Sequence, residues 1–359
     1  MSNPAKDFHH VTLLPEGRTF TVRPEESILD AALNVGINLP HSCKGGSCSS
    51  CRAQLVTGRT SYPFGRPAGI TAEEEERGFV LLCEARPESN VSVHIRAIQL
   101  PEEVEIKDLP CRIARKELLA PDVMALFLQL PAIETLHFLP GQYLDVMLAG
   151  ERRRSFSIAS PPHDSELIEL HVRRAPGGEF TQRVFTDLKE RSLLRIEGPL
   201  GQFAYQHDAT APALLIGGGT GFAPLKSILR HVLEKGLRRE LHLYWGARTV
   251  PDLYQHELVL EWTKRHPQLT YTPVLSDLAV ADPWPGRRGL VHEAVFADYP
   301  DLRGMDVYAS GPPALIEAIR KFGALQGLEP ERLHFDSFEY APDALARMRA
   351  KEGSDLAIT

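Results

Sequence analysis

The segment 41-HSCKGGSCSSCRAQ-54 decides how this chain is understood, because it holds three cysteines within nine residues. Four residues separate Cys43 from Cys48, and two separate Cys48 from Cys51. The chain has 359 residues and only 5 cysteines, and its polar N-terminus lacks the apolar core of a secretory signal. Clustered cysteines in a reducing compartment are more often metal ligands or catalytic groups than disulfides. We therefore expect a metal centre in a cytoplasmic protein.

A fourth cysteine completes the pattern. Cys83 follows Cys51 after 31 intervening residues, within the apolar stretch 78–85. The pattern C-x4-C-x2-C…C is the spacing of a plant-type [2Fe–2S] cluster. Three ligands from one short loop must wrap a compact cluster, and Gly45 and Gly46 permit the backbone angles that this requires. The predicted metal ligands are Cys43, Cys48, Cys51 and Cys83.

Other interpretations of these cysteines fit the spacing less well. A structural zinc site usually shows two paired ligand halves, whereas one half here is a single cysteine. A Rieske centre needs two histidine ligands, and four cysteines already complete the set, so His41 is interpreted as a loop residue. A chance cluster of buried free cysteines is the remaining alternative. Cys111 is left over and is expected to be an ordinary half-buried residue.

The segments around the cysteine loop predict a small β-grasp domain over residues 1–100. Segments 9–24 and 91–100 alternate like strands. Between them, segment 25–40 has apolar residues at helical spacing, and Gly36 can end that helix. This arrangement of strands around one helix resembles a plant-type ferredoxin domain.

Composition and charge exclude several classes of protein. The formal net charge is -7 and no basic stripe stands out, so no nucleic-acid partner is expected. No run of 18 apolar residues predicts a membrane span. The acidic run 73–76 is interpreted as the solvated first turn of a helix rather than a docking patch, because Thr71 and Glu74 predict a capping box. Monomer is the default state.

The middle of the chain predicts an antiparallel barrel over residues 110–208. Residues 101–109 are charged and proline-flanked, which is typical of a linker. After them, short strand-like segments are separated by turn residues at regular intervals. The expected strands are 111–120, 122–131, 142–150, 155–160, 167–175 and 193–201.

The segment 154-RSFS-157 lies at the start of one of these strands. Strand alternation places Arg154 and Phe156 on one face and the two serines on the other. Arginine is suited to binding a phosphate through two parallel hydrogen bonds. An aromatic ring can lie against a flat ring system, although a buried phenylalanine is usually just part of a core.

The segment 177-GGEFTQRVF-185 places two glycines before a helix, with Thr181 in its first turn. Such helix N-termini bind phosphate through free N–H groups and the helix dipole. Behind a ferredoxin-like domain, this segment and 154–157 together resemble the flavin domain of the ferredoxin–NADP reductase superfamily, which uses an Arg-x-Tyr-Ser element.

That resemblance implies roles for single residues of the barrel. Arg154 would bind the flavin pyrophosphate, Phe156 would pack on the isoalloxazine, and Ser157 would lie near the flavin N5. The pyrophosphate would lie against Gly178 and Thr181. Phenylalanine in place of the tyrosine leaves a smaller flavin possible, but FAD is expected. The resemblance also assigns to the flavin site Val172, Arg173 and Gly177.

The segment 211-APALLIGGGTGFAPLKSILRHVLEKG-236 predicts a strand, a glycine turn and a helix. Pro224 belongs in the first turn of that helix, and Gly236 suits its C-terminus. The turn reads G-x-G-x-x-P, which is not the standard G-x-G-x-x-G fingerprint. Strand and helix alternate through residues 209–340, which predicts a doubly wound parallel sheet with its ligand at the carboxyl ends of the strands.

The glycine turn, the segment YWGAR at 244–248 and 307-VYASGPP-313 together resemble the pyridine-nucleotide domain of the same superfamily. Relatives usually have cysteine at the position of Ser310, whose hydroxyl can still contact the reacting ring. Ser157 and Ser310 are therefore the predicted catalytic residues. The nucleotide-binding residues implied are Gly218, Gly219, Thr220, Gly221, Pro224, Arg248, Ser310, Gly311, Pro312 and Phe338.

Two of these residues, Arg248 and Phe338, have more than one interpretation. Arg248 could bind the 2′-phosphate of NADPH, stack on adenine with NADH, or be a solvated charge at a strand end. NADH is expected, with NADPH as the alternative. Phe338 could cover the flavin face where nicotinamide enters, or pack in the core.

The resemblance covers the chain to about residue 340, and no role is assigned to the tail 341–359. The predicted fold is thus a multidomain α+β, all-β and α/β protein. Its domain order resembles the reductases of multicomponent oxygenases and of deoxysugar biosynthesis. It implies an iron–sulfur flavoprotein oxidoreductase that passes electrons from NADH through FAD and the cluster, singly, to an oxygenase, hydroxylase or dehydrase. The alternatives are a flavin reductase that releases reduced flavin and a non-catalytic redox-sensing protein.

Overall fold

The computed structural model divides into two compact units, Met1–Ile106 and Lys107–Thr359, which we call the N-terminal and C-terminal units. No helix among the described residues is long and apolar enough to span a membrane. The structure describes residues 8–41, 44–46, 50–67, 69–95, 104–150, 152–164, 166–206, 210–278 and 283–338.

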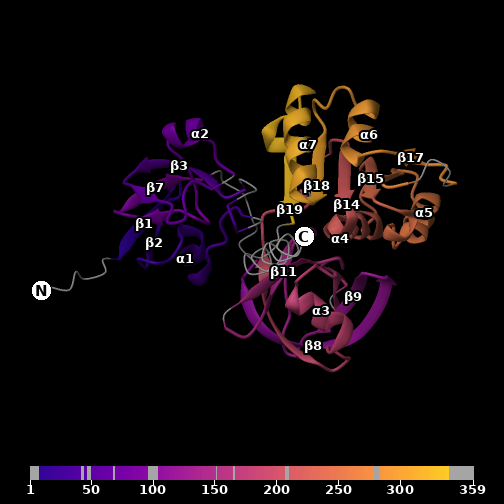
Figure 1. The fold of residues 1–359 in the computed structure, drawn as a ribbon, viewed down its shortest axis with the longest axis horizontal. Coiled ribbons are helices and arrows are strands. Elements are labelled where there is room, and N and C mark those ends of the chain that lie inside the picture. The colour runs from indigo at the N-terminus through magenta and orange to yellow at the C-terminus, as the bar shows by residue number, and fades with distance from the viewer. Residues whose placement is uncertain are drawn as a thin grey trace, which may run out of the picture. The chain divides into compact units, whose positions relative to one another are not determined.

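The N-terminal unit is a mixed five-stranded sheet with one helix packed on it (Figure 1). Strands β1 and β7 are parallel, and the other neighbours are antiparallel. Helix α1 (Ile28–Asn34) buries its apolar side chains in the same core as the sheet, as the β-grasp prediction requires. A two-stranded sheet pairs β4 (Thr60–Ser61) with β6 (Arg86–Pro87). In sheet order the main strands are β2 (Arg18–Val22), β1 (His9–Leu14), β7 (Val91–His94), β3 (Arg52–Thr57) and β5 (Phe79–Leu81).

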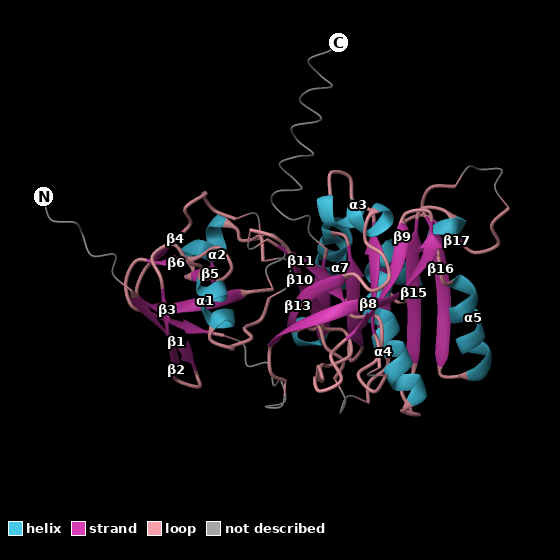
Figure 2. Ribbon diagram, turned by 90° about the horizontal axis from the view of Figure 1, so that it is seen from below, coloured by secondary structure: helices cyan, strands magenta, loops and turns pink. Residues whose placement is uncertain are grey.

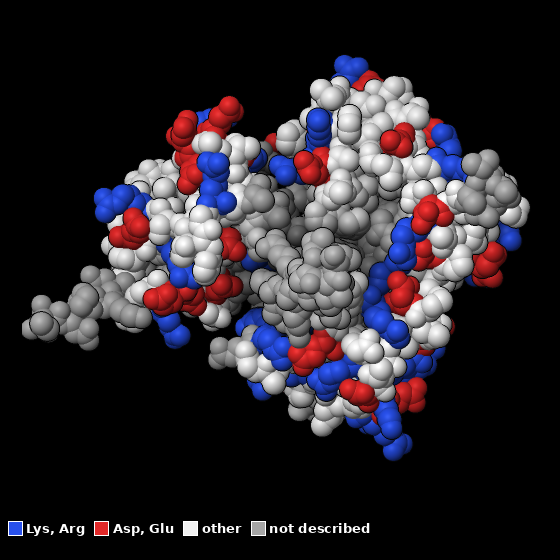
Figure 3. Space-filling view, in the orientation of Figure 1, with Lys and Arg blue, Asp and Glu red and all other residues white. Residues whose placement is uncertain are grey.

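The ends of the helices in this unit form as the sequence predicts. Gly36 takes a φ of 76° just after α1, which is the left-handed conformation that favours glycine. Helix α2 (Ala72–Glu76) begins with the predicted capping box between Thr71 and Glu74. The glutamates of α2 give the group of red atoms above this unit in Figure 3. Over the rest of that view, acidic and basic residues are interspersed.

The first half of the C-terminal unit is an antiparallel six-stranded sheet that closes on itself. A bridge between Ile158 and Leu170 joins the end of the first strand to the last one, so the predicted barrel is confirmed. Helix α3 (Glu179–Thr186) packs Phe180 and Val184 into the barrel core. In sheet order the strands are β11 (Arg153–Ser157), β10 (Tyr143–Met147), β13 (Leu193–Leu200), β8 (Lys107–Ala120), β9 (Val123–Gln129) and β12 (Ile168–Arg173).

The second half is a parallel six-stranded sheet, and strands of it stand side by side in Figure 2. Helices α4 (Phe222–Glu234) and α5 (His256–Arg265) contribute to the core on one face. Helices α6 (Val291–Asp298) and α7 (Pro313–Leu325) contribute to the core on the other. The doubly wound prediction is therefore confirmed. In sheet order the strands are β17 (Arg287–Arg288), β16 (Leu269–Leu275), β15 (Leu241–Ala247), β14 (Ala213–Gly218), β18 (Asp306–Gly311) and β19 (Leu333–Ser337).

The chain order reverses between β14 and β18. Strands β15 to β17 extend the sheet on one side of β14, and β18 and β19 extend it on the other. In open sheets of this type, ligands bind beyond the carboxyl ends of the strands at such a switch point. The predicted glycine turn follows β14, and Ser310 and Gly311 end β18, so both predicted nucleotide elements lie at this edge.

Candidate functional site

Two of the four predicted cluster ligands lie together in the N-terminal unit. Cys51 directly precedes β3 and Cys83 follows β5, and these strands pair Arg52 with Leu81. The N–H of Leu82 donates to the carbonyl of Cys51 at 3.1 Å, so the two thiols lie at the same edge of the sheet. Both cysteines are buried. The other predicted ligands, Cys43 and Cys48, lie outside the described residues.

The described part of the cysteine loop needs unusual backbone angles. Gly46 has a φ of 74°, and an added Cβ would lie 2.7 Å from Pro67. Lys44 also takes a left-handed φ, of 54°, whereas Gly45 does not. The prediction was right for Gly46, but the second left-handed position is a lysine rather than the neighbouring glycine.

A phenol lies beside the two cysteines. The Tyr62 hydroxyl accepts a hydrogen bond from the N–H of Leu81 at 2.9 Å. Burial, together with the nearby charges of Glu75, Cys51 and Cys83, raises the pKa of Tyr62 to about 12. This side chain therefore stays protonated and neutral next to the sulfurs.

The glycine turn of the C-terminal unit is packed against the end of β18. An added Cβ on Gly221 would lie 2.0 Å from the carbonyl oxygen of Ser310. Gly311 has a φ of 147°, and its Cβ would lie 3.0 Å from the N–H nitrogen of Gly218. Gly219 begins the short 3-10 turn η1 (Gly219–Gly221) with a φ of 57°. Only glycines allow these two strand ends to approach so closely.

The two predicted catalytic serines lie at this same edge. Ser157 ends β11, and its Oγ donates to Asp336 Oδ2 at 3.1 Å. Ser310 pairs with Asp336 across the parallel strands β18 and β19. Its Oγ is fully buried and has no hydrogen-bond partner among the described residues. The barrel and the nucleotide sheet thus share a polar edge built by Ser157, Asp336 and Ser310.

The other three residues of the RSFS element have different surroundings. Phe156 packs against the barrel core, and its ring centroid lies 5.5 Å from that of Phe180 in α3. Arg154 Nη1 donates to the carbonyl of Arg153 at 2.7 Å. Ser155 Oγ donates to the buried Asp145 at 2.6 Å. The arginine of this element is therefore half-buried beside its own strand.

The predicted pyrophosphate turn is braced by a threonine. Thr181 Oγ1 accepts from the N–H of Ala175 and donates to the carbonyl of Gly178, both at 3.1 Å. Gly178 is the N-cap residue of α3, and an added Cβ there would lie 2.5 Å from Thr181 Oγ1. Gly177 takes a φ of 68°. Gly178 itself is buried and its N–H donates to the carbonyl of Ala175 at 3.0 Å, so an anion at this helix N-terminus would meet the N–H groups that follow Gly178.

Two arginines lie near Asp122 and Asp252. Arg173 ends β12, and its Nη1 lies 3.4 Å from Asp122 and 3.6 Å from Asp252. Its Nε and Nη2 are buried without a hydrogen-bond partner among the described residues. A Cβ on Gly219 would lie 3.8 Å from that Nη2. Arg248 is mostly exposed, and its Nη2 lies 3.2 Å from Asp252 Oδ1.

The remaining predicted residues differ in position. Val172 is fully buried in the barrel core, and Pro224 is buried in the first turn of α4. Thr220 is half-buried in the turn η1, and Pro312 is the N-cap residue of α7. The N–H of Phe338 donates to the carbonyl of Gly311 at 2.8 Å, which brings Phe338 to the nucleotide edge.

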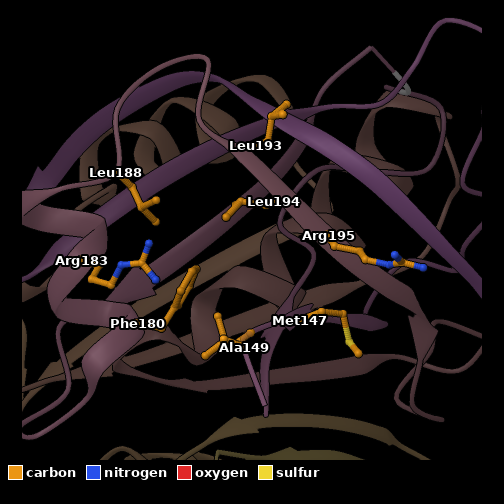
Figure 4. Close-up of a pocket in the computed structure, with 9 residues that line it drawn as sticks. Met147, Ala149, Phe180, Arg183, Leu188, Leu193, Leu194 and Arg195 are labelled. Atoms are coloured by element: carbon orange, nitrogen blue, oxygen red, sulfur yellow. The ribbon is translucent and has the colours of Figure 1, made fainter. Parts of the chain in front are cut away.

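A hollow of about 300 Å³ on the barrel is separate from all of these residues. Phe180, Leu188 and Leu194 face it, whereas Arg195 points away (Figure 4). Arg195 pairs with Asp108 through two hydrogen bonds. None of the predicted flavin-site residues lines this hollow.

Three family models match the chain in succession. They are the 2Fe-2S iron-sulfur cluster binding domain over residues 11–88, the oxidoreductase FAD-binding domain over 110–205, and the oxidoreductase NAD-binding domain over 215–321. The chain is 36% identical to the CDP-6-deoxy-L-threo-D-glycero-4-hexulose-3-dehydrase reductase of Yersinia pestis, over 92% of this chain and 98% of that protein. The chain belongs to the FAD/NAD-binding reductases with an N-terminal 2Fe-2S ferredoxin domain.

Two further relatives extend this family. Reductase component 1 of the terephthalate 1,2-dioxygenase of Comamonas sp is 34% identical over 93% of this chain and 98% of its own. The crystal structure of an Amycolatopsis cytochrome P450 reductase matches with a TM-score of 0.77 at 34% identity, covering 92% of this reductase and 98% of that chain. This reductase is therefore an iron–sulfur flavoprotein that carries electrons from NADH through FAD to a [2Fe–2S] cluster.

The residues of the structure fit these cofactors. The buried nitrogens of Arg173 that lack a partner among the described residues, together with the N-terminus of α3, suit a pyrophosphate. The hydroxyl of Ser310, which has no hydrogen-bond partner in the described part of the chain, suits a polar group of a ring bound at the switch point. The two buried thiols at one sheet edge suit half of a four-cysteine ligand set.

Some residues of the site were missed by the sequence analysis. Asp336 lies within the segment 335-FDSFEY-340, in which the resemblance assigns a role to Phe338 alone. Asp122 and Asp252 pair with both arginines but follow no motif. The one available signal was an acid at Asp336, placed two residues before an aromatic at a strand end.

Proposed function

We propose that this reductase delivers single electrons to a partner protein that is an oxygenase, a hydroxylase or a deoxysugar dehydrase. The observation that carries the proposal is the hydrogen bond from Ser157 to Asp336, 3.1 Å long. It joins the end of the flavin-barrel strand to the switch-point edge of the nucleotide sheet within one compact unit. A nucleotide bound at that edge would lie beside the RSFS element.

The residues around the edge have distinct roles in this proposal. When bound, FAD takes two electrons from NADH and releases them one at a time to the cluster, which carries single electrons. Asp336 accepts from Ser157 and so fixes the direction of that hydroxyl. Ser310 offers a buried hydroxyl from the neighbouring strand. Thr181 holds the turn whose N–H groups would bind the pyrophosphate.

The carboxylates around Arg248, which follows strand β15, support NADH over NADPH as the electron donor. Arg248 is the residue that the sequence offers for a 2′-phosphate, and Asp252 and Asp122 lie 3.2 and 3.9 Å from its Nη2. The hydrogen bond and charge of Asp252 raise the pKa of Arg248 further. A 2′-phosphate would have to displace or approach these carboxylates, which repel it.

The test is an anaerobic titration of the holoprotein with NADH, with NADPH as a parallel arm. Flavin and cluster absorbance are followed together. We expect NADH to bleach the flavin and then reduce the cluster, with NADPH at least about tenfold less effective, a difference of about 1.4 kcal/mol. A cluster that stays oxidised while the flavin is reduced would contradict the proposal.

The acceptor is tested by reconstitution. The names of the similar relatives include a dehydrase reductase and a dioxygenase reductase component, which supports both acceptor classes. Purified dehydrase and oxygenase components are each added to the NADH-reduced protein. We expect rapid cluster reoxidation with one class only, coupled to product formation. Because cluster cysteines must remain available as ligands, we place the reaction in a reducing, cytoplasmic compartment.

A further inference from the structure

Strand β12 has two faces with different chemistry. Ile168, Leu170 and Val172 belong to the barrel core. The alternate residues, Glu169 and His171, are also buried, although both are polar. Because successive side chains of a strand point to opposite faces, these polar groups face away from the barrel core. They meet the nucleotide-binding half of the unit.

Glu169 forms a buried ion pair across this boundary. Lys226 Nζ, from helix α4, lies 2.7 Å from Glu169 Oε1 and 2.9 Å from Oε2. Each of these residues is only 5% exposed. Next to the pair, Ser227 Oγ donates to the carbonyl of Ser160 at 2.7 Å, and Ser160 Oγ accepts from the N–H of Glu169. Two consecutive residues of α4 are thus fastened to the barrel.

Further hydrogen bonds complete the cluster. His171 Nε2 lies 3.0 Å from Glu169 Oε1, and His171 Nδ1 lies 3.0 Å from the Tyr254 hydroxyl. Burial lowers the pKa of His171 and raises that of Tyr254, so the ring is neutral and the phenol protonated. Burial alone would raise the pKa of Glu169, but His171 and Lys226 together lower it to about 2. Tyr254 therefore donates to His171, which donates to an ionised Glu169.

This cluster lies next to the nucleotide turn. Helix α4 starts directly after Gly221, and Lys226 is in its second turn. Trp245 Nε1 donates to the carbonyl of Gly219 at 2.9 Å, and its ring stacks on Phe222 at 4.0 Å. The Phe222 ring also stacks on His171, at 6.4 Å. The glycine turn and the buried ion pair therefore belong to one packed structure.

The same strand also reaches the flavin site. Arg173 lies two positions beyond His171 on β12 and contacts Asp252. A shift of α4 along β12 would thus change the distance between the glycine turn and Arg173. Among the described residues, the side chains of Glu169 and Lys226 form hydrogen bonds with each other and with His171, none of which is assigned to the flavin or the nucleotide.

We propose that Glu169 and Lys226 are positioning residues, which hold the glycine turn in register with β12 and so set the rate of electron transfer from NADH to flavin. This inference rests on the proposed function. A misplacement of about 1 Å far from the reacting atoms can lower a rate by about 10²-fold. The pair therefore contributes to alignment beyond its contribution to stability.

The test uses holoprotein variants Lys226→Met, Glu169→Gln and the double variant, with Lys235→Met as the control. Lys235 is an exposed lysine at the end of the same helix. Anaerobic stopped-flow absorbance gives the flavin-reduction rate at saturating NADH and the Kd for NADH. We expect the rate to fall about 10- to 100-fold in the first two variants, with Kd changed less than about threefold. The control should match the wild type.

Stability and amide exchange distinguish positioning from folding. Each single variant leaves one buried charge without its partner, whereas the double variant removes both charges. The double variant should therefore unfold at a higher temperature than either single variant. We expect its flavin-reduction rate to stay low. In the oxidised holoproteins of the single variants, amide hydrogen exchange should speed up in α4 and β12 and stay unchanged in the N-terminal unit.

A surface pocket offers a rescue experiment. It has a volume of about 340 Å³ and is lined by both Glu169 and Lys226. In Lys226→Ala, added propylammonium should restore the rate by at least about fivefold, whereas added propanol should not. This variant also serves if Lys226→Met does not fold.

Three outcomes would overturn the inference. The first is an unchanged flavin-reduction rate in a folded single variant. The second is a flavin-reduction rate that recovers together with stability in the double variant. The third is a flavin-reduction rate in Lys226→Ala that does not change when propylammonium is added. The wild-type titration described above tests the proposed function separately. If wild-type flavin is not reduced by NADH, the proposed function fails, whatever the variants do.

Discussion

The cluster edge of the N-terminal unit and the nucleotide edge of the C-terminal unit use side chains in opposite ways. At the cluster edge, the thiols of Cys51 and Cys83 are brought together by the pairing of β3 with β5. At the nucleotide edge, the backbone of Gly221 touches that of Ser310 because no side chain intervenes. The cluster edge depends on the thiol groups of its cysteines, whereas the nucleotide edge depends on the absence of side chains at its glycines.

This difference predicts how each edge responds to substitution. A lost thiolate removes one cofactor and leaves the other unit intact, because the units have separate cores. An added methyl group at the nucleotide edge must displace backbone on two strands. Side chains that only line this edge should have smaller effects, about the size of one hydrogen bond.

The largest effect is expected for Cys51→Ser. Without this thiolate the cluster should not assemble, so NADH-dependent reduction of cytochrome c should fall by at least about 100-fold, because electrons leave through the cluster. Ferricyanide reduction, which can take electrons from the flavin, should stay within about twofold of the wild type. The control is Cys111→Ser, which lies in the barrel core. Surviving cytochrome reduction in cluster-free protein would show another exit for electrons.

The next largest effect is expected for Gly221→Ala. Its Cβ would lie 2.0 Å from the Ser310 carbonyl oxygen, which cannot move without displacing β18. We expect a loss of about 1–3 kcal/mol in the free energy of unfolding and an increase in KM for NADH. Gly217→Ala is the matched comparison, because its Cβ would meet the flexible tip of Leu225 at 3.1 Å. Equal effects in denaturant melts and NADH kinetics would contradict the close-approach argument.

A smaller effect is expected for Asp336→Asn. The amide can still contact Ser157, but it loses the charge that accepts the hydrogen bond. We expect flavin reduction by NADH to slow by about 3- to 10-fold, equivalent to about 1 kcal/mol. Single-turnover stopped-flow measures this rate. Ser155→Ala, on the same strand but bonded to Asp145, should leave the rate unchanged; a similar loss in both variants would place the effect in the barrel.

The smallest effect concerns stability against pH. Burial lowers the pKa of His334 to about 4, so the folded protein holds it neutral while the unfolded chain protonates it near 6.5. This contribution is complete above pH 6.5 and is lost as pH falls toward 4, amounting to about 2 kcal/mol by pH 5. His334→Phe should keep the stacking on Tyr308 and flatten the pH dependence of denaturant unfolding between about pH 7.5 and 5. An unchanged pH dependence in this variant would contradict the argument.

The sequence predicted those features whose chemistry is local. Four cysteines at fixed spacing leave few alternatives, and the two described cysteines flank the paired strands β3 and β5. The capping box of Thr71 and Glu74, and Gly36 after helix α1, also form as predicted, because they involve only near neighbours. The barrel and the doubly wound sheet followed from strand and helix periodicity.

Contacts between distant segments could not be predicted in the same way. Ser157 and Asp336 are 179 residues apart, and only the packing of the barrel against the nucleotide sheet joins them. The alternation of polar and apolar residues in β12 was visible, but it is typical of a strand with one solvent-exposed face. Glu169 is instead buried, because Lys226 of helix α4 in the nucleotide-binding half pairs with it.

The position of Cys111 makes the C-terminal unit almost inert toward thiol reagents. It is the only cysteine after residue 106, since serine occupies position 310. Burial raises its pKa to about 12, so almost no thiolate forms at neutral pH. Any rapid reaction of the native protein with a maleimide or a disulfide reagent therefore reports on the four remaining cysteines. The rate of reaction with a chromogenic disulfide reagent therefore measures cluster loss in the native protein, without a tag or an engineered site.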